Sequence, residues 1–415
     1  MPTRAPGTSS QTLTVLACRA VGVLVFLLVS LAVVPAGAQT QREDPSVFAA
    51  MRFGSLAISP TLAIRDVGVD TNVLGTPDSD PEFTMSFVPG VLGWLRIGRL
   101  RLSTETEVEW QYFQKTDEQR SFSVSETAKV ELLLAYLTPY ASGTYDNTKR
   151  RQTSEFDARV RQKTTGYAGG VTVYPGPRTD VDLQYRRMRY RFGDEVIVGV
   201  DLATLLDRDN TATELNVGYA VTPLTRVVAR LVRETDEFDQ SDVRNSDSWS
   251  ILPGLEFKPS ALISGSAHVG YRSFDMREPG SRDFQGVVAA VDLKYVARDM
   301  TKVEVRAVRD VEYSFELDQP VYLDTGWQVQ LTQAITYEWD VRGQVAQNRL
   351  EYQPNAGITA PPRRDRIWVY GVGVGRRLGI EVRVGVDVIY STRESNAPGR
   401  GYDGFRVGGS VTYGF

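Results

Sequence analysis

The chain ends in the sequence Phe405-Arg406-Val407-Gly408-Gly409-Ser410-Val411-Thr412-Tyr413-Gly414-Phe415. Its large apolar side chains all fall on odd positions, and Arg406 and Thr412 fall on even ones. A period of two is that of a β-strand, because successive side chains of a strand point to opposite faces. We therefore expect an extended strand with one apolar face and one polar face.

The same alternation recurs along the rest of the chain. Residues 100–112 show it clearly, with Leu102 and Trp110 on one face and Glu105 and Glu107 on the other. We count about eighteen such segments, in line with the even strand numbers of bacterial barrels. The predicted segments start near residues 56, 83, 100, 121, 136, 156, 179, 209, 224, 245, 261, 283, 299, 321, 337, 364, 380 and 403.

Short and long connections alternate between these segments. Short turns fall at residues 98–99, 175–177, 222–223, 258–260, 298–299 and 378–379. Longer polar stretches fall at residues 72–82, 149–155, 194–209, 239–245, 277–282, 353–364 and 395–402. This asymmetry is typical of tight periplasmic turns and longer extracellular loops. The sequence thus predicts an all-β fold: a transmembrane antiparallel up-and-down β-barrel of about 18 strands, with both termini in the periplasm.

The beginning of the chain has the order of a secretory signal peptide. An apolar run at residues 21–34 follows Arg4 and Arg19, and Ala36-Gly37-Ala38 follows the run. The run is short against the roughly 20 residues of a spanning helix, so we favour a cleaved signal. We expect a signal peptide at 1–38, a short periplasmic segment at 39–54 and an outer-membrane barrel at 55–415. The only cysteine, Cys18, would leave with the signal.

If the apolar face meets lipid, the polar face lines the interior, and it carries charges of both signs. A barrel of this size encloses an aqueous channel unless something plugs it. Opposed acidic and basic rows would favour polar solutes in that channel. The simpler alternative is that most of these charges pair between neighbouring strands and stabilise the wall. The candidate lumen-lining residues are Glu105, Glu107, Glu109, Arg159, Arg161, Lys163, Arg187, Arg189, Arg226, Arg230, Lys302, Glu304, Arg306, Arg383 and Asp387.

The predicted segment that starts near residue 179 does not alternate regularly. Its apolar residues occupy odd positions up to Tyr185 and even positions from Met188 onward. A β-bulge near Arg186 would explain the change. We therefore expect Arg187, Arg189 and Arg191 to point inward.

The residues required for catalysis or metal binding are scarce. The one histidine, His268, lies two positions from Ser266 on a predicted strand, without a nucleophile elbow or an orienting third residue. One histidine and no cysteine in the mature chain make a zinc site improbable. We predict no enzymatic activity, no metal and no cofactor. The formal net charge of −4 also argues against a nucleic-acid partner.

Both ends of the predicted barrel resemble known outer-membrane proteins. The first hairpin contains Ile58-Ser59-Pro60-Thr61-Leu62, Asp70-Thr71-Asn72-Val73, Asp78-Ser79-Asp80 and Phe87-Val88-Pro89-Gly90. It resembles the opening of an outer-membrane β-barrel (porin-like) family whose members often belong to exopolysaccharide synthesis and export systems. The last segment resembles the closing strand of bacterial outer-membrane barrels. That resemblance implies that Phe415 engages the barrel-assembly machinery.

We consider three functions. The leading one is a polar-lined pore for a polar solute or for polysaccharide export. The second is a closed barrel that acts as a structural or docking partner of a periplasmic polysaccharide machinery. The third, an outer-membrane hydrolase, would depend on His268. Expected partners are outer-membrane lipid, lipopolysaccharide, the assembly machinery, and polysaccharide or export proteins.

Overall fold

The computed structural model describes residues 44–77, 79–193, 196–197, 199–259, 261–280, 283–298, 300–355, 361–379 and 381–414. The predicted signal peptide, Asp78 of the first-hairpin motif and Phe415 lie outside the described residues. Of the predicted segment 39–54, the structure describes the part from residue 44 onward.

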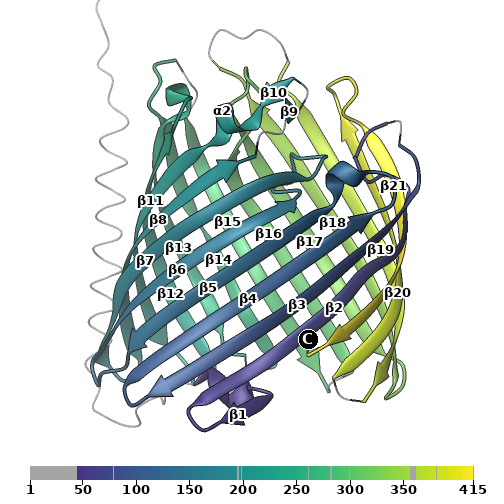
Figure 1. Ribbon diagram of the computed structural model, residues 1–415. Coiled ribbons are helices and arrows are strands. Elements are labelled where there is room, and N and C mark those ends of the chain that lie inside the picture. The colour runs from purple at the N-terminus through teal and green to yellow at the C-terminus, as the bar shows by residue number, and fades with distance from the viewer. Residues whose placement is uncertain are drawn as a thin grey trace, which may run out of the picture.

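Eighteen long antiparallel strands form one closed ring, and the short strand β1 (Met51–Phe53) is added to it (Figure 1). The ring closes because β2 pairs with both β3 and β21. The predicted fold and strand number are confirmed, and each predicted start lies within four residues of the observed one. The ring strands are β2 (Leu56–Asp70), β3 (Glu82–Ile97), β4 (Leu100–Phe113), β5 (Ser121–Leu132), β6 (Leu137–Arg150), β7 (Val160–Gly176), β8 (Thr179–Phe192), β11 (Arg208–Ala220), β12 (Thr225–Phe238), β13 (Ser246–Phe257), β14 (Ile263–Met276), β15 (Phe284–Ala297), β16 (Thr301–Tyr313), β17 (Val321–Ala334), β18 (Trp339–Gln353), β19 (Arg364–Leu378), β20 (Val382–Ser395) and β21 (Tyr402–Tyr413).

The two ends of the barrel differ in their connections. At the end that we call the turn end, two to five residues join successive ring strands; at the loop end, six to fifteen residues do so. The strand β1 and the end of β21 both lie at the turn end (Figure 1). Short elements of the loop-end connections are η2 (Asp117–Gln119), β9 (Val196–Ile197), β10 (Val200–Asp201), α2 (Leu202–Leu206) and η3 (Asp242–Arg244), whereas η1 (Pro45–Phe48) precedes β1. Within the described residues, no helix is long and apolar enough to span a membrane.

A single β-bulge interrupts the closing seam. The pairing of β2 with β21 shifts between Ile64 and Val67, and Asp66 has a φ of 57° there. The bulge can be seen in the sequence, because the large apolar residues of β2 occupy even positions up to Ile64 and odd positions from Val67 onward. The extra residue brings Arg65 and Asp66 to the same side of the wall.

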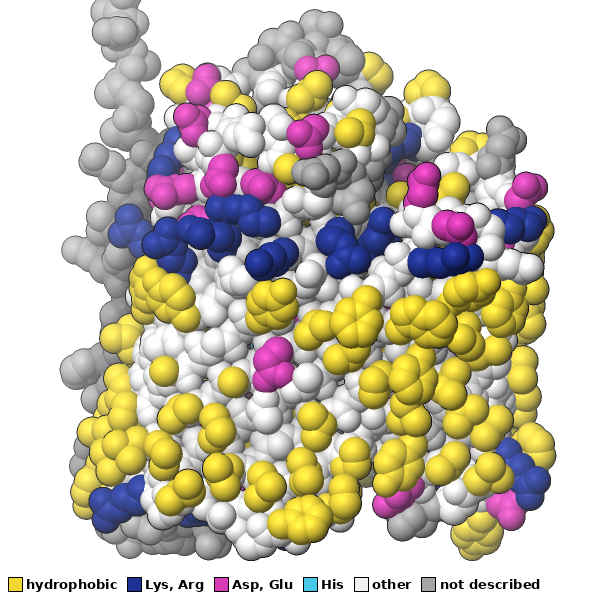
Figure 2. Space-filling model, in the orientation of Figure 1, with side chains coloured by type: hydrophobic (Ala, Val, Ile, Leu, Met, Phe, Trp, Pro, Cys, Tyr) yellow, Lys and Arg dark blue, Asp and Glu magenta, His cyan; other side chains and the backbone are white. Residues whose placement is uncertain are grey.

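The outer surface carries a belt of apolar side chains (Figure 2). Aromatic rings form a continuous row within it across β19, β20 and β21. Ring centroids lie 5.7 Å apart for Trp368 and Tyr370, 6.5 Å for Tyr370 and Tyr390, and 4.6 Å for Tyr390 and Phe405. Such rows are typical of the boundary between a membrane and water, where amphipathic rings settle.

Candidate functional site

The register of the strands places most of the predicted lumen residues on the inner face. These residues alternate with exposed apolar residues of the outer face, such as Trp110 on β4 and Val384 and Val386 on β20. Arg159 lies in the β6–β7 connection, where its guanidinium stacks on the inward-facing Phe113 ring. The residues placed inside are Glu105, Glu107, Glu109, Arg159, Arg226, Arg230, Lys302, Glu304, Arg306, Arg383 and Asp387.

Four candidate lumen residues point outward instead: Arg161, Lys163, Arg187 and Arg189. Arg191, which was expected to point inward with the last two, also points outward. Arg187 and Arg189 bind Asp209 on the outer face, and their side chains are about half exposed. The predicted bulge near Arg186 is wrong, because β8 pairs with β11 from Thr179 to Tyr190 without a shift. The apolar residues that changed parity, Met188, Tyr190 and Phe192, point inward, and the ring of Phe192 packs against the loop residue Phe156.

Most inward charges pair with one another along the wall, as the simpler alternative predicts. Arg230 lies 3.2 Å from Glu214, and Arg306 lies 3.1 Å from Asp292. The remaining pairs of predicted residues are Arg226 with Glu256 at 2.6 Å, Lys302 with Glu304 at 2.8 Å and Arg383 with Asp340 at 2.7 Å. These pairs fix side chains against the wall and leave little free charge there.

Glu105 and Glu107 differ from the paired wall charges. Both are exposed on the inner face of β4, and neither has an ion pair with any described residue. Two carboxylates on one strand therefore face the solvent of the lumen. They add negative charge to this side of the lumen.

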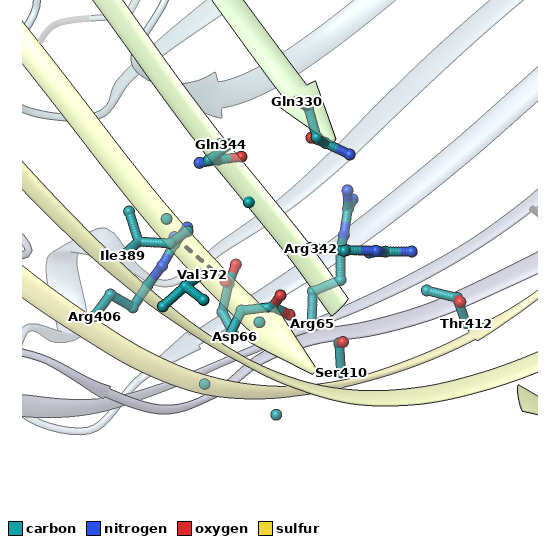
Figure 3. A pocket seen from close by; sticks show the side chains of 16 residues that line it. Arg65, Asp66, Gln330, Arg342, Gln344, Val372, Ile389, Arg406, Ser410 and Thr412 are labelled. Carbon is teal, nitrogen blue, oxygen red and sulfur yellow. Dashed lines mark ion pairs between the residues drawn. The ribbon is translucent and has the colours of Figure 1, made fainter. Parts of the chain in front are cut away.

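A polar cavity of about 360 Å³ lies against the inner wall formed by β2 and β17 to β21 (Figure 3). Three arginines, Arg65, Arg342 and Arg406, line it, and Arg406 is paired with Asp66 at 3.3 Å. The buried Nε of Arg342 has no hydrogen-bond partner among the described residues. The sequence prediction omitted Arg65 and Arg342, although the strand parity of each could have identified it as inward-facing.

The β6–β7 connection, residues 151–159, crosses the lumen at the loop end. Tyr322 donates a hydrogen bond to Thr153 Oγ1 over 3.0 Å, and Ser154 Oγ donates to Asp324 Oδ2 over 3.3 Å. Tyr322 and Asp324 belong to β17, which is the strand opposite β6 in the ring of eighteen. The connection therefore contacts the strand that lies opposite its own in the ring.

The end of the β16–β17 hairpin bends into the lumen to meet this connection. The pairing of β15 with β16 stops at Arg309, whereas β16 and β17 stay paired up to Tyr313 and Val321. The apolar back of the hairpin then packs on Phe274 and Phe284, which belong to β14 and β15. Its tip, residues 314–320, is thereby held inside the barrel.

An apolar cluster joins three loop-end connections. Phe156 of the first connection lies 5.3 Å from Phe315 of the hairpin tip, measured between ring centroids. Leu202, Leu205 and Leu206 of α2 are buried against the same cluster. We call residues 151–159, 199–207 and 314–320 the constriction, because together they narrow the loop-end mouth of the lumen.

Buried charges lock the constriction to the wall. Arg393 on β20 donates to the carbonyl oxygen of Glu155 over 3.1 Å and also pairs with Asp157 and Asp365. Arg363 binds the same Asp365 at 2.6 Å and Glu316 of the hairpin tip at 2.6 Å. One network thus links β19 and β20 to two parts of the constriction.

Glu155 lies at the centre of the constriction and is fully buried. Its carboxylate accepts hydrogen bonds from Ser314 Oγ at 2.6 Å and from the backbone N–H of Phe315 at 3.2 Å. Burial raises the pKa of Glu155 to about 7, because the charged form loses its hydration there. The contact between the two connections therefore includes a group that titrates near neutral pH.

A family described as "Putative beta-barrel porin 2" matches residues 49–415 of the chain. The chain belongs to this family. As a porin-like barrel it is a protein of the outer membrane, and the family's description names no enzymatic activity. His268, which the hydrolase hypothesis requires, is a buried wall residue of this porin-family barrel, with its Nε2 3.9 Å from Glu256.

The chain is also similar to several solved structures at low sequence identity. The outer membrane protein opdK from Pseudomonas aeruginosa is 12% identical, with 86% of this chain and 98% of that chain covered and a TM-score of 0.47. OccAB3 from Acinetobacter baumannii is 9% identical, with 86% and 99% covered and a TM-score of 0.48. A BenF-like porin from Pseudomonas fluorescens Pf-5 is 10% identical, with 86% and 98% covered and a TM-score of 0.47. No curated protein matched this porin-family chain.

Proposed function

We propose that the protein is a gated pore through which small, hydrated polar solutes cross the outer membrane. The observation that carries this proposal is the charged inner face of a closed eighteen-strand ring, with Glu105 and Glu107 exposed inside it. Barrels of this strand number are wide enough to hold an aqueous channel. An apolar solute would gain no apolar contact from this polar lining.

The proposal includes an orientation. Outer-membrane barrels place short turns in the periplasm and long loops outside, so the loop end and its constriction face the exterior. Since β1 and the end of β21 lie at the turn end, both termini are then periplasmic. The predicted signal peptide, residues 1–38, is removed during export.

The constriction acts as the gate. A solute that enters from the loop end meets residues 151–159 first, so these residues must move aside before it passes. They are held by hydrogen bonds, one apolar cluster and the Arg393 network, and not by a ladder of paired strands. Such a segment opens locally at a lower free-energy cost than the barrel wall does.

The same constriction supports a second candidate, a closed barrel that docks a periplasmic machinery. A mouth crossed by three connections argues against a permanently open conduit for a polymer chain. The association with exopolysaccharide systems therefore rests on the first-hairpin resemblance alone. In this second candidate, polysaccharide or export proteins bind the turn end and no solute passes.

Conductance across planar lipid bilayers separates the two candidates. The purified protein is compared with a variant in which a short Gly-Ser linker replaces residues 152–158. The pore proposal expects brief, small openings from the wild type and longer, larger ones from the variant. If neither protein conducts, although both migrate as folded barrels on unheated gels, the docking candidate stands and the pore proposal fails.

A further inference from the structure

The polar cavity on the inner wall, which we call the wall cavity, lies on the turn-end side of the constriction. Two of its lining residues, Gln330 and Arg342, lie near the turn-end limits of β17 and β18. A solute that has passed the constriction therefore meets the wall cavity before it leaves the barrel. The volume of about 360 Å³ falls within the roughly 300–1,000 Å³ of pockets that hold small molecules.

Charged residues and glycines alternate across the wall of this cavity. The register places Arg342 of β18 opposite Gly373 of β19, and Gly373 opposite Asp387 of β20. Asp387 in turn lies opposite Gly408 of β21. A Cβ atom at Gly373 would overlap Oδ1 of Asp387, so the carboxylate lies over that glycine. Two strand spacings, roughly 10 Å, separate the backbones of Arg342 and Asp387, and the glycine between them keeps the cavity open.

The bulge of β2 supplies another side of the wall cavity. In a regular strand one of the neighbours Arg65 and Asp66 would face the lipid, but the bulge turns both inward (Figure 3). Asp66 has a φ of 57° there, which is uncommon for a residue other than glycine. Asp66 pairs with Arg406 at 3.3 Å, whereas Arg65 has neither an ion pair nor a hydrogen bond with any described residue. The bulge thus brings a free guanidinium group into the cavity.

The wall cavity also holds a free carboxylate. Asp387, like Arg65, has neither an ion pair nor a hydrogen bond within the described part of the chain. Arg342 is only partly satisfied, because its buried Nε lacks a hydrogen-bond partner among the described residues. Its ion-pair partner Asp340 is 3.9 Å away and is bound by Arg383 at 2.7 Å. The lining therefore offers guanidinium donors and one carboxylate acceptor that do not pair with each other.

We propose that the wall cavity binds a small zwitterionic solute of the class of the α-amino acids. The carboxylate of the solute accepts hydrogen bonds from Arg65 and Arg342, because a guanidinium group matches a carboxylate in charge and geometry. The ammonium group of the solute donates to Asp387. A solute with one charge would leave Arg65 or Asp387 without a partner, and a neutral sugar would pair with neither as an ion. The proposal rests on the pore function proposed above and names the class of solute.

Titrations of the detergent-purified protein, followed by saturation-transfer NMR, test the proposal. The probes are L-alanine, N-acetyl-L-alanine, which lacks the ammonium group, L-alaninamide, which lacks the carboxylate, and glucose, which has no charge. The site variants are Arg65→Gln and Asp387→Asn. The matched control is Arg306→Gln, because Arg306 is another inward arginine but pairs with Asp292 at 3.1 Å, outside the wall cavity.

The wild type should bind L-alanine at least roughly fivefold more tightly than either derivative, since each derivative loses one charge-assisted contact. Arg65→Gln should weaken the binding of L-alanine and N-acetyl-L-alanine and leave that of L-alaninamide unchanged. Asp387→Asn should weaken the binding of L-alanine and L-alaninamide and leave that of N-acetyl-L-alanine unchanged. The control should bind all probes as the wild type does.

Three results would overturn the proposal: no binding of L-alanine to the wild type, equal affinity for L-alanine and its two derivatives, or tighter binding of glucose. These results concern the wild type and do not depend on whether the variants fold. An equal loss of affinity in the control and the site variants would also overturn it, because the site would then not be the wall cavity. Conductance in planar bilayers reports on the pore separately. A protein that conducts without discriminating between the probes contradicts this proposal alone, and one that discriminates without conducting contradicts the pore.

Discussion

Ser154 of the β6–β7 connection donates a hydrogen bond to Asp324 of β17, which is the strand opposite β6 in the ring. One short connection therefore contacts the strand opposite its own at the loop end, where the end of the β16–β17 hairpin bends inward to meet it. The lumen of this porin-family barrel has a charged interior and a mouth crossed by its own loops. Whether the protein conducts depends on how readily the contact between the β6–β7 connection and β17 opens.

Loss of Arg393 should loosen the constriction. Arg393→Gln removes the cation that Asp157 and Asp365 share. Asp365 keeps Arg363 at 2.6 Å, and Asp157 keeps Arg400 at 3.8 Å. The cost should therefore stay below the about 3–5 kcal/mol of a buried pair whose remaining charge has no partner. Single-channel recordings should show longer openings than the wild type gives. Arg383→Gln is the matched control, because Arg383 is also a buried inward arginine of β20 but pairs with Asp340 of the wall. Equal effects of the two substitutions would mean that Arg393 has no special role in closing the lumen.

The constriction should open more readily as the pH rises. Burial raises the pKa of Glu155 to about 7 and also raises that of Asp157. The raised pKa stabilises the packed constriction, and this stabilisation is complete at pH values below the ordinary pKa of the carboxyl group. It is lost as the pH rises through about 7. The open probability should therefore increase between pH 5 and pH 8. Glu155→Gln should flatten the dependence of the open probability on pH near pH 7. If this dependence does not change, Glu155 is not the titrating group.

The free carboxylates of β4 should favour cations in the lumen. An ion about 10 Å from one such charge in water gains roughly 0.4 kcal/mol before salt screens it. Replacement of Glu105 and Glu107 by Gln should thus lower the cation-to-anion permeability ratio about twofold, measured from reversal potentials in a salt gradient. Glu126→Gln is the control, because Glu126 points outward and accepts hydrogen bonds from Thr104 and Thr106. If Glu126→Gln changes the permeability ratio as much as the double variant does, the claim that Glu105 and Glu107 face the lumen while Glu126 faces outward is contradicted.

The apolar belt can be tested with a charge. Val386 is half exposed on the outer face of β20, so Val386→Arg would place a cation among the lipid tails. Unfolding in urea from liposomes should show a loss of about 2–4 kcal/mol near the midplane of the bilayer. Asp387→Asn, one residue away on the inner face, should change the stability little. A larger loss of stability with Asp387→Asn than with Val386→Arg would mean that Asp387 faces the lipid and Val386 faces the lumen.

The sequence predicted the barrel well because its strands alternate over their full length. In β4, for example, Trp110 and Glu109 are neighbours with opposite environments, and that contrast is visible without a structure. The prediction was wrong in β8, where Met188, Tyr190 and Phe192 are apolar yet point inward. Burial under the constriction and burial in lipid require the same side-chain chemistry, so hydrophobicity alone could not separate them.

The constriction itself was not predictable from the local sequence. The alternation of connections predicted a longer loop at residues 149–155, and the structure has one at residues 151–159. Thr153 and Ser154 are ordinary loop residues. Their partners, Tyr322 and Asp324, lie about 170 residues further along the chain. Only the closed ring brings these segments together. The helix α2 is a further part of the loop packing that narrows the mouth.

A reversible cross-link tests the central claim, that the constriction gates conduction. Ser154→Cys and Asp324→Cys place two thiols at the positions now joined by a 3.3 Å hydrogen bond, and the chain's only other cysteine, Cys18, lies in the predicted signal peptide. Mass spectrometry confirms that the disulfide has formed before recording. We predict no current through the oxidised variant in planar bilayers and channel openings after addition of a reductant. Equal currents before and after reduction, or no current in either state, would contradict the account.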